Sequence, residues 1–165
     1  MIVLVIGQSA SGKTTYVKRS YVKDCQEPRV DEKTGLPFVV SGGTAVIGKY
    51  NVGKRCEGTD TLSFTCQDAI LDLIKRLALS GVDVVAEGDR ITNDKVIGGL
   101  VRWSKTPIRL ILFRCPIDVS CKRRASTGSN PNEKFVKATA TKAYKMFQKY
   151  KSLVAESFER THKPM

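Results

Sequence analysis

The residues with the clearest chemistry form a glycine-rich segment near the start of the chain. The pattern of Gly, four residues, Gly, Lys and then Ser or Thr, which is typical of phosphate-binding loops, is met by Gly7, Gln8, Ser9, Ala10, Ser11, Gly12, Lys13 and Thr14. Glycines let the backbone wrap a polyphosphate, and successive N–H groups supply positive potential. Lys13 would reach the β- and γ-phosphates, and the Thr14 hydroxyl would ligate Mg²⁺. The segment, together with Thr15, therefore predicts binding of a nucleotide polyphosphate with Mg²⁺; we expect ATP, and GTP stays open because no adenine-specific contact can be read from the sequence.

Two predicted elements would position this segment. Residues 2–6 are an unbroken apolar run rich in β-branched side chains, which predicts a buried strand of a parallel sheet. The residues from Thr14 to Tyr21 have a composition compatible with a helix. A strand, a loop and a helix are the context that the phosphate-binding pattern requires. The alternative is a glycine-rich turn that matches the pattern by accident.

Carboxylates are the candidates for acid–base and metal chemistry, because the only histidine, His162, stands three residues from the C-terminus. Asp60 lies in a polar loop before a predicted helix. It could orient or deprotonate an acceptor hydroxyl, or it could cap that helix. Glu87 and Asp89 follow the predicted strand 82–86, where a carboxylate could hold Mg²⁺ directly or through water, or cap a turn.

Basic residues supply further candidates. Arg123 and Arg124 precede a flexible loop at 126–131, within a predicted lid around residues 118–132 that could close a guanidinium onto the transferred phosphoryl group. Neighbouring helical residues point about 100° apart, so we expect only one of the two arginines to reach the phosphates. Both could also be ordinary surface residues. Contacts to an acceptor are expected from Tyr50, Arg55 and Arg90.

The alternation of strands and helices predicts one α/β domain, residues 1–165, with the three-layer sandwich and mainly parallel sheet of a P-loop nucleoside-kinase-like fold. In such a sheet, ligands bind at the carboxyl ends of the strands. We expect further strands at 38–40, 44–47, 82–86 and 108–113, and helices from about 63 or 65 to 80, from 93 or 94 to 103, and at 118–124. A surface loop is expected at 24–38, and one basic helix from about 132 to 158.

The charge of the chain is concentrated in its last part. The net charge is +12, and residues 102–165 carry 15 Lys and Arg against four Asp and Glu, whereas residues 1–101 carry 13 against 12. Such a field attracts polyanions, which predicts DNA as a partner. The alternative is a solvated helix with a lysine-rich exposed face.

Cysteine usage and hydropathy bear on the compartment. The five cysteines include no Cys-x-x-Cys pair, and no apolar stretch approaches the ~20 residues of a spanning helix. We therefore expect a reduced, cytoplasmic protein that does not enter a membrane. No protein partner can be inferred from the sequence.

These residues resemble the small P-loop kinases, the group that includes gluconate, shikimate, adenylyl-sulfate and polynucleotide kinases. The shared features are GQSASGKT after the first strand, an acidic residue after the second strand region, VVAEGDR at the third, and a strand followed by a lid that bears KRR. A narrower resemblance, to the phage-encoded 5-hydroxymethyluracil DNA kinases, is carried by GKYNVGKRCEGTDTLS followed by VVAEGDRITN. It implies ATP-dependent phosphorylation of the hydroxymethyl group of a modified base in DNA, in the host cytoplasm, with Asp60 as the catalytic aspartate.

A base within duplex DNA must leave the stack to meet the γ-phosphate. Aromatic residues that could stack on it, or that could instead be core residues, are Trp103, Tyr50, Phe64 and Phe38. Two other functions stay open at this point. One is a kinase of a small metabolite or nucleotide, and the other is a nucleotide-dependent DNA-binding ATPase or switch module.

Overall fold

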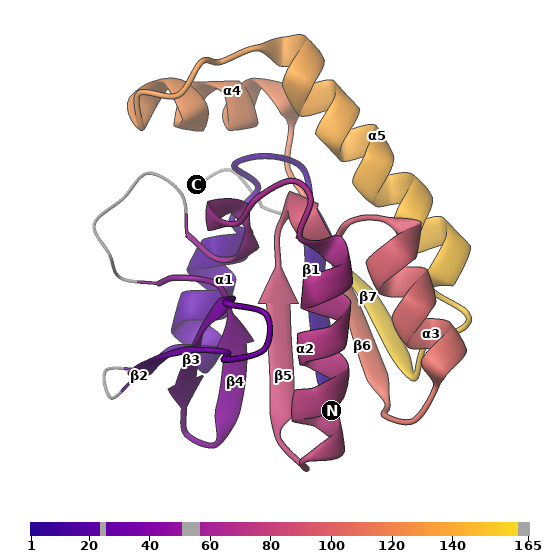
Figure 1. The fold of residues 1–165 in the computed structure, drawn as a ribbon. Coiled ribbons are helices and arrows are strands. Elements are labelled where there is room, and N and C mark those ends of the chain that lie inside the picture. Colours follow the sequence, from indigo (N-terminus) through magenta and orange to yellow (C-terminus); the bar gives the residue numbers. More distant parts are fainter. Residues whose placement is uncertain (24–25, 51–56, 162–165) are drawn as a thin grey trace.

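A seven-stranded sheet forms the centre of the molecule. The computed structural model describes residues 1–23, 26–50 and 57–161. Within them, the strand order is β2-β3-β4-β5-β1-β6-β7 (Figure 1). The strands are β1 (Ile2–Gly7), β2 (Glu27–Val30), β3 (Pro37–Ser41), β4 (Thr44–Ile47), β5 (Asp83–Glu87), β6 (Ile108–Arg114) and β7 (Glu156–Thr161). Neighbours from β4 to β7 pair in parallel, and only β2, β3 and β4 pair antiparallel, so the expected mainly parallel α/β sheet is confirmed.

Helices cover both faces of this sheet, which gives the three expected layers. They are α1 (Lys13–Tyr21), α2 (Gln67–Leu79), α3 (Gly99–Trp103), α4 (Ile117–Ser126) and α5 (Glu133–Tyr150). Side chains alternate along β1: Ile2, Leu4 and Ile6 belong to the core cluster with α2, α3 and α5, whereas Val3 and Val5 pack in the cluster that contains Val17 of α1. No helix in the described ranges is both long and apolar enough to cross a membrane.

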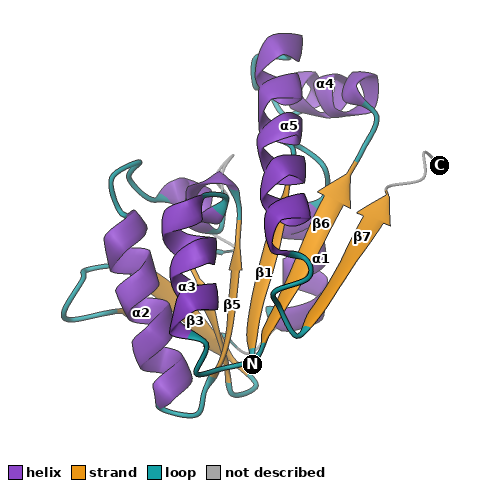
Figure 2. Ribbon diagram, turned by 90° about the vertical axis from the view of Figure 1, so that its right-hand side faces the viewer, coloured by secondary structure: helices purple, strands orange, loops and turns teal. Residues whose placement is uncertain are grey.

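The connections bring several loops to one edge of the sheet. The chain leaves β1 through α1 toward the β4 side, and it leaves β6 through α4 and α5 toward β7. The carboxyl ends of β1 and β6 therefore flank a topological switch point, where open α/β sheets bind ligands. Figure 2 shows α4 and the first part of α5 above these strand ends. The glycine-rich loop, residues 7–14, begins at the same edge.

The prediction of a surface loop over residues 24–38 is wrong in part, because Glu27–Val30 forms β2 and pairs with β3. All four residues of β2 are exposed at the sheet edge, and Pro28 is among them. An edge strand without buried side chains carries no apolar alternation, and proline is tolerated there. Hydrophobic periodicity therefore could not reveal it.

The prediction of a helix from about 132 to 158 is also wrong in part. Helix α5 ends at Tyr150, and after a turn the chain forms β7, which pairs with β6 in parallel. Apolar spacing up to Tyr150 is helical, but Phe158 packs with the cluster on the α1 face as a strand residue. The helix predicted from Ser63 or Thr65 begins slightly later, at Gln67.

Candidate active site

The glycine-rich loop is held in an open curve between β1 and α1. A Cβ on Gly7 would lie 2.4 Å from the carbonyl oxygen of Phe113 in β6, so only glycine fits at the end of β1. Ala10 has a φ of 58°, which is a strained value for a residue with a side chain. Gly12 precedes α1 and provides no side-chain cap. The first N–H groups of α1 are thus left for an anion.

Two buried polar side chains line this loop. The Lys13 ammonium, which is buried, donates to the carbonyl oxygens of Gly7 at 3.0 Å and Gln8 at 2.7 Å. The Ser11 hydroxyl oxygen is also buried and has no hydrogen-bond partner among the described residues. A buried hydroxyl without a partner is unfavourable, and a phosphate oxygen would satisfy it. The residues present therefore fit a polyphosphate.

Glu87 meets the loop at the end of β5. Its Oε1 accepts a hydrogen bond from the Thr14 hydroxyl at 2.8 Å and one from the Tyr50 hydroxyl at 3.5 Å. The side chain is fully buried, and burial raises the pKa of Glu87 to about 7, although Lys13 and Thr14 favour the ionised form. A carboxylate beside a hydroxyl supplies the hard oxygen ligands that Mg²⁺ prefers. No group of three or more His, Cys, Asp or Glu gathers in the described part of the chain, so Mg²⁺ here would depend on phosphate and water for its other ligands.

Asp60 lies against the same strand end. Its Oδ1 accepts the backbone N–H of Asp89 at 2.9 Å, and a Cβ on Gly88 would lie 2.8 Å from that oxygen. The negative charge of Asp60 contributes to the raised pKa of Glu87, so the two carboxylates share one electrostatic site. The residue that precedes α2 is Cys66, so Asp60 does not cap that helix.

Asp89 is placed differently from Glu87. Its carboxylate forms an ion pair with Lys142 of α5 at 3.0 Å, and the same ammonium lies 3.4 Å from the Asp89 carbonyl oxygen. Of the two candidate metal ligands, only Glu87 is hydrogen-bonded to Thr14. The geometry therefore favours Glu87 for the metal and Asp89 for anchoring α5.

Both arginines of the predicted lid contact the glycine-rich loop, and the expectation that only one of them reaches the phosphates stays a prediction. Arg123 donates from Nη1 to the carbonyl oxygen of Ala10 at 3.1 Å, and Arg124 donates from Nη1 to the Ser9 hydroxyl at 2.6 Å. Helix α4 lies over the loop (Figure 2). Two long side chains that leave the helix in different directions can therefore reach different residues of one curved loop.

Three contacts of the loop were not predicted. The buried side-chain amide of Gln8, a residue expected to bind nucleotide, donates to the carbonyl oxygen of Cys115 at 2.7 Å and to the Ser120 hydroxyl at 2.8 Å. The backbone N–H of Ser9 donates to the Thr139 hydroxyl of α5 at 3.1 Å. Thr139 and Lys142 stand three positions apart, which places both on one face of a helix. The spacing could have indicated that Thr139 and Lys142 face the same neighbour, but it did not identify the glycine-rich loop as that neighbour.

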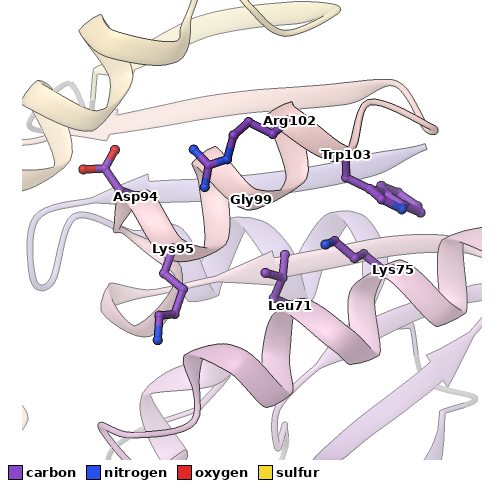
Figure 3. Close-up of a pocket in the computed structure, with 7 residues that line it drawn as sticks. All are labelled: Leu71, Lys75, Asp94, Lys95, Gly99, Arg102 and Trp103. Atoms are coloured by element: carbon purple, nitrogen blue, oxygen red, sulfur yellow. The ribbon is translucent and has the colours of Figure 1, made fainter.

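The residues expected to contact an acceptor are spread over several environments. The guanidinium of Arg90 stacks on the ring of Phe64 at 3.6 Å, and this ring is 72% exposed. Tyr50 and Phe38 are buried. Trp103 lines a pocket between α2 and α3 whose lining includes no residue of the glycine-rich loop (Figure 3). Thr15 is exposed on α1, whereas Arg55 and His162 lie outside the described residues.

The fold thus gathers an anion cradle, a buried carboxylate beside a hydroxyl, a second carboxylate and two arginines at one edge of the sheet. This combination can neutralise a polyphosphate and place a base beside it, as phosphoryl transfer requires. A comparison of the chain with protein-family models and with curated protein sequences finds no match.

Proposed function

We propose that this protein is a P-loop kinase that transfers the γ-phosphoryl group of ATP to a hydroxyl group. The observation that carries the proposal is the hydrogen bond between Thr14 and the buried Glu87, formed beside Lys13 in a loop that fits a polyphosphate. Asp60 adds a carboxylate that accepts a backbone hydrogen bond two residues beyond the same strand end. A structural turn would have no need of this concentration of charge.

The roles follow from the contacts. Lys13, the Ser11 hydroxyl and the N-terminus of α1 would hold the phosphates, and Thr14 with Glu87 would hold Mg²⁺, which neutralises phosphate charge. Asp60 accepts the proton of the acceptor hydroxyl while the oxygen of that hydroxyl forms a bond to the γ-phosphorus. The bond from that phosphorus to the β,γ-bridging oxygen breaks, and ADP leaves. Arg123 and Arg124 would leave their contacts with the loop and stabilise the negative charge that develops on the transferred group.

For the acceptor, we propose the hydroxymethyl group of 5-hydroxymethyluracil in DNA. Its support is the resemblance of residues 48–63 and 84–93 to the phage DNA kinases, together with the positive charge of residues 102–165. Lys142 connects that charge to the site through its ion pair with Asp89. The exposed Phe64 ring under Arg90 offers a surface on which a base can stack.

The test supplies radiolabelled ATP and Mg²⁺ with three acceptors: DNA that contains the modified base, the same DNA with thymine, and free nucleosides. We expect label on the modified DNA alone. Label on free nucleosides alone would contradict the DNA acceptor and support a kinase of small molecules. Slow ATP hydrolysis without a phosphorylated product would contradict the kinase itself and support a switch or ATPase.

The variant Asp60→Asn distinguishes the role of Asp60 as a base from its role as the acceptor of a structural hydrogen bond. The asparagine oxygen can still accept the Asp89 N–H, but it cannot take a proton from the acceptor. We expect the rate of transfer to fall about 10²–10⁴-fold while ATP affinity and thermal stability stay close to those of the wild type. Asp60→Ala, which loses both functions, should in addition lower stability. Equal transfer rates in wild type and Asp60→Asn would remove Asp60 from the chemistry.

A further inference from the structure

A groove of about 590 Å³ lies between α2 and the helical segment that follows β5 (Figure 3). Its walls are α2 on one side, and on the other a π-helical turn at Asp94–Gly98 that continues into α3. Leu71 and Lys75 point from α2 toward α3 (Figure 3). None of the roles assigned above uses this groove, which we call the α2–α3 groove.

The α2–α3 groove combines positive charge with one aromatic wall. Its lining includes Lys75, Lys95 and Arg102 beside Trp103. The Lys75 ammonium lies 6.0 Å from the centroid of the Trp103 ring. Lys95 pairs at the rim with Asp68, at 3.0 Å and with both side chains exposed, which is a weak interaction in water.

The remaining charges leave the groove positive. Arg102 forms no salt bridge with the described part of the chain. The one acidic residue of the lining, Asp94, is paired with Lys149 of α5 at 2.7 Å. The groove therefore keeps cations that can accept the negative charge of a ligand.

We propose that the α2–α3 groove binds an unpaired stretch of DNA that flanks the acceptor base; this inference rests on the proposed function. Cations that follow a phosphate backbone, next to an aromatic ring on which a base stacks, are how proteins hold single strands without reading their sequence. Lys95 and Trp103 stand eight positions apart, roughly 12 Å along a helix, so the cations and the ring are spread along the groove.

The α2–α3 groove is flanked by elements that start at the edge of the sheet where the candidate active site lies. Helices α2 and α3 both begin at the edge where the strands end, because α2 precedes β5 and the segment with α3 follows it. Phe64, with Arg90 stacked on it, stands just before the first turn of α2 at this edge. A strand that leaves the acceptor site would pass this pair and continue along Lys95, Lys75 and Trp103.

The chain offers a direct probe, because Trp103 is its only tryptophan. We would titrate the protein, without ATP, with a ten-nucleotide oligodeoxythymidylate and follow tryptophan fluorescence. Saturable quenching is expected, and the logarithm of the binding constant should fall with the logarithm of salt concentration with a slope of about −2 for three phosphate contacts. Lys75→Ala and Arg102→Ala should each weaken binding and reduce the slope by about 0.7. Arg29→Ala, which removes an exposed arginine of β2, is the charge-matched control and should bind as the wild type does.

Any of three results with DNA would overturn the inference: the oligonucleotide causes no quenching, both groove variants bind it as tightly as the control does, or a fully paired duplex binds with the same affinity. Quenching by inorganic phosphate at the same concentration would also contradict it, because it would indicate a simple anion site. Transfer assays on a modified oligonucleotide and on the matching free nucleoside separate this inference from the proposed function. Groove variants should raise KM for the oligonucleotide alone, whereas failure of all transfer in the wild type with intact quenching would contradict only the kinase.

Discussion

The surroundings of Glu87 disfavour the ionised form of its carboxyl group. It is 1% exposed, and burial raises its pKa to about 7 from 4.5. Between these two pH values the folded protein holds a proton that the unfolded chain has released. Stability therefore decreases as pH rises through this window, by about 3 kcal/mol in total from this group. Below pH 4.5 the group makes no difference, because both states are protonated.

Glu87→Gln should remove this pH dependence. The glutamine oxygen can still accept the Thr14 hydroxyl, but no proton is exchanged. We expect the variant to gain about 3 kcal/mol relative to the wild type between pH 4.5 and pH 8, because all other titrating groups cancel in the difference. Urea unfolding with EDTA at several pH values measures it. A constant difference between the two proteins would contradict the buried, protonated carboxyl.

Ser11 should have opposite effects on the free and the nucleotide-bound protein. Its buried hydroxyl oxygen has no partner among the described residues, so Ser11→Ala removes an unsatisfied group and should stabilise the free protein by about 1–2 kcal/mol. If a phosphate oxygen is the partner, the same change weakens ATP binding. Thermal unfolding without and with ATP gives both numbers. Ser20→Ala, at an exposed position of α1, is the control and should change neither.

At the scale of elements, α4 acts as a unit through its two arginines. Because Arg123 and Arg124 both contact the glycine-rich loop, each alanine variant should lower kcat by about 10²-fold or more, with a smaller effect on ATP affinity. Lys122→Ala is the matched control, since that side chain is 81% exposed and pairs only weakly with Asp118 at 3.9 Å. Single-turnover kinetics separates chemistry from binding. Equal rates for all three variants would make the arginine contacts structural.

The elements that were predictable from sequence are those with a buried apolar face. Residues 2–6 are a continuous apolar run, 82–86 and 108–113 are apolar apart from one charged residue each, and all three became central parallel strands. Strands β2 and β7 lie at the two edges, and their side chains are exposed or half-buried. The hydrophobic pattern therefore does not change clearly between the end of α5 and β7, and it contains no sign of the boundary. Edge strands are specified by backbone pairing across the sheet, which local periodicity does not report.

The same contrast applies to the candidate site. Lys13, Thr14, Asp60 and Glu87 stand at strand ends or in a known loop pattern, and the structure brings them together. Thr139 and Lys142 come from the middle of α5, more than 50 positions from the residues they contact. Their roles depend on how α5 crosses the ends of the strands. Such a long-range arrangement has no local signature in the sequence.

At the scale of the whole molecule, the positive charge is unevenly distributed, and this distribution affects how salt changes the reaction. Residues 102–165 contain 15 basic and four acidic residues, and their helix α5 reaches the candidate site through Lys142. If the acceptor is DNA, several phosphates are neutralised at once, and binding weakens as a power of salt concentration. We expect KM for the modified DNA to rise about 10²-fold or more between 50 and 200 mM salt, which corresponds to four or more phosphate contacts.

A control measurement with a free nucleoside distinguishes the effect of the positive charge of residues 102–165 from general effects of salt on catalysis. A free nucleoside that carries the same hydroxymethyl group has no phosphate, so its KM should change little over the same range, and kcat for both acceptors should stay nearly constant. Exchanging Lys134 and Lys145 of α5 for glutamine should reduce the salt dependence for DNA without altering the nucleoside reaction, because both side chains are exposed. Equal salt dependence for the two acceptors would mean that the charge of residues 102–165 serves solvation and that the acceptor is a small molecule.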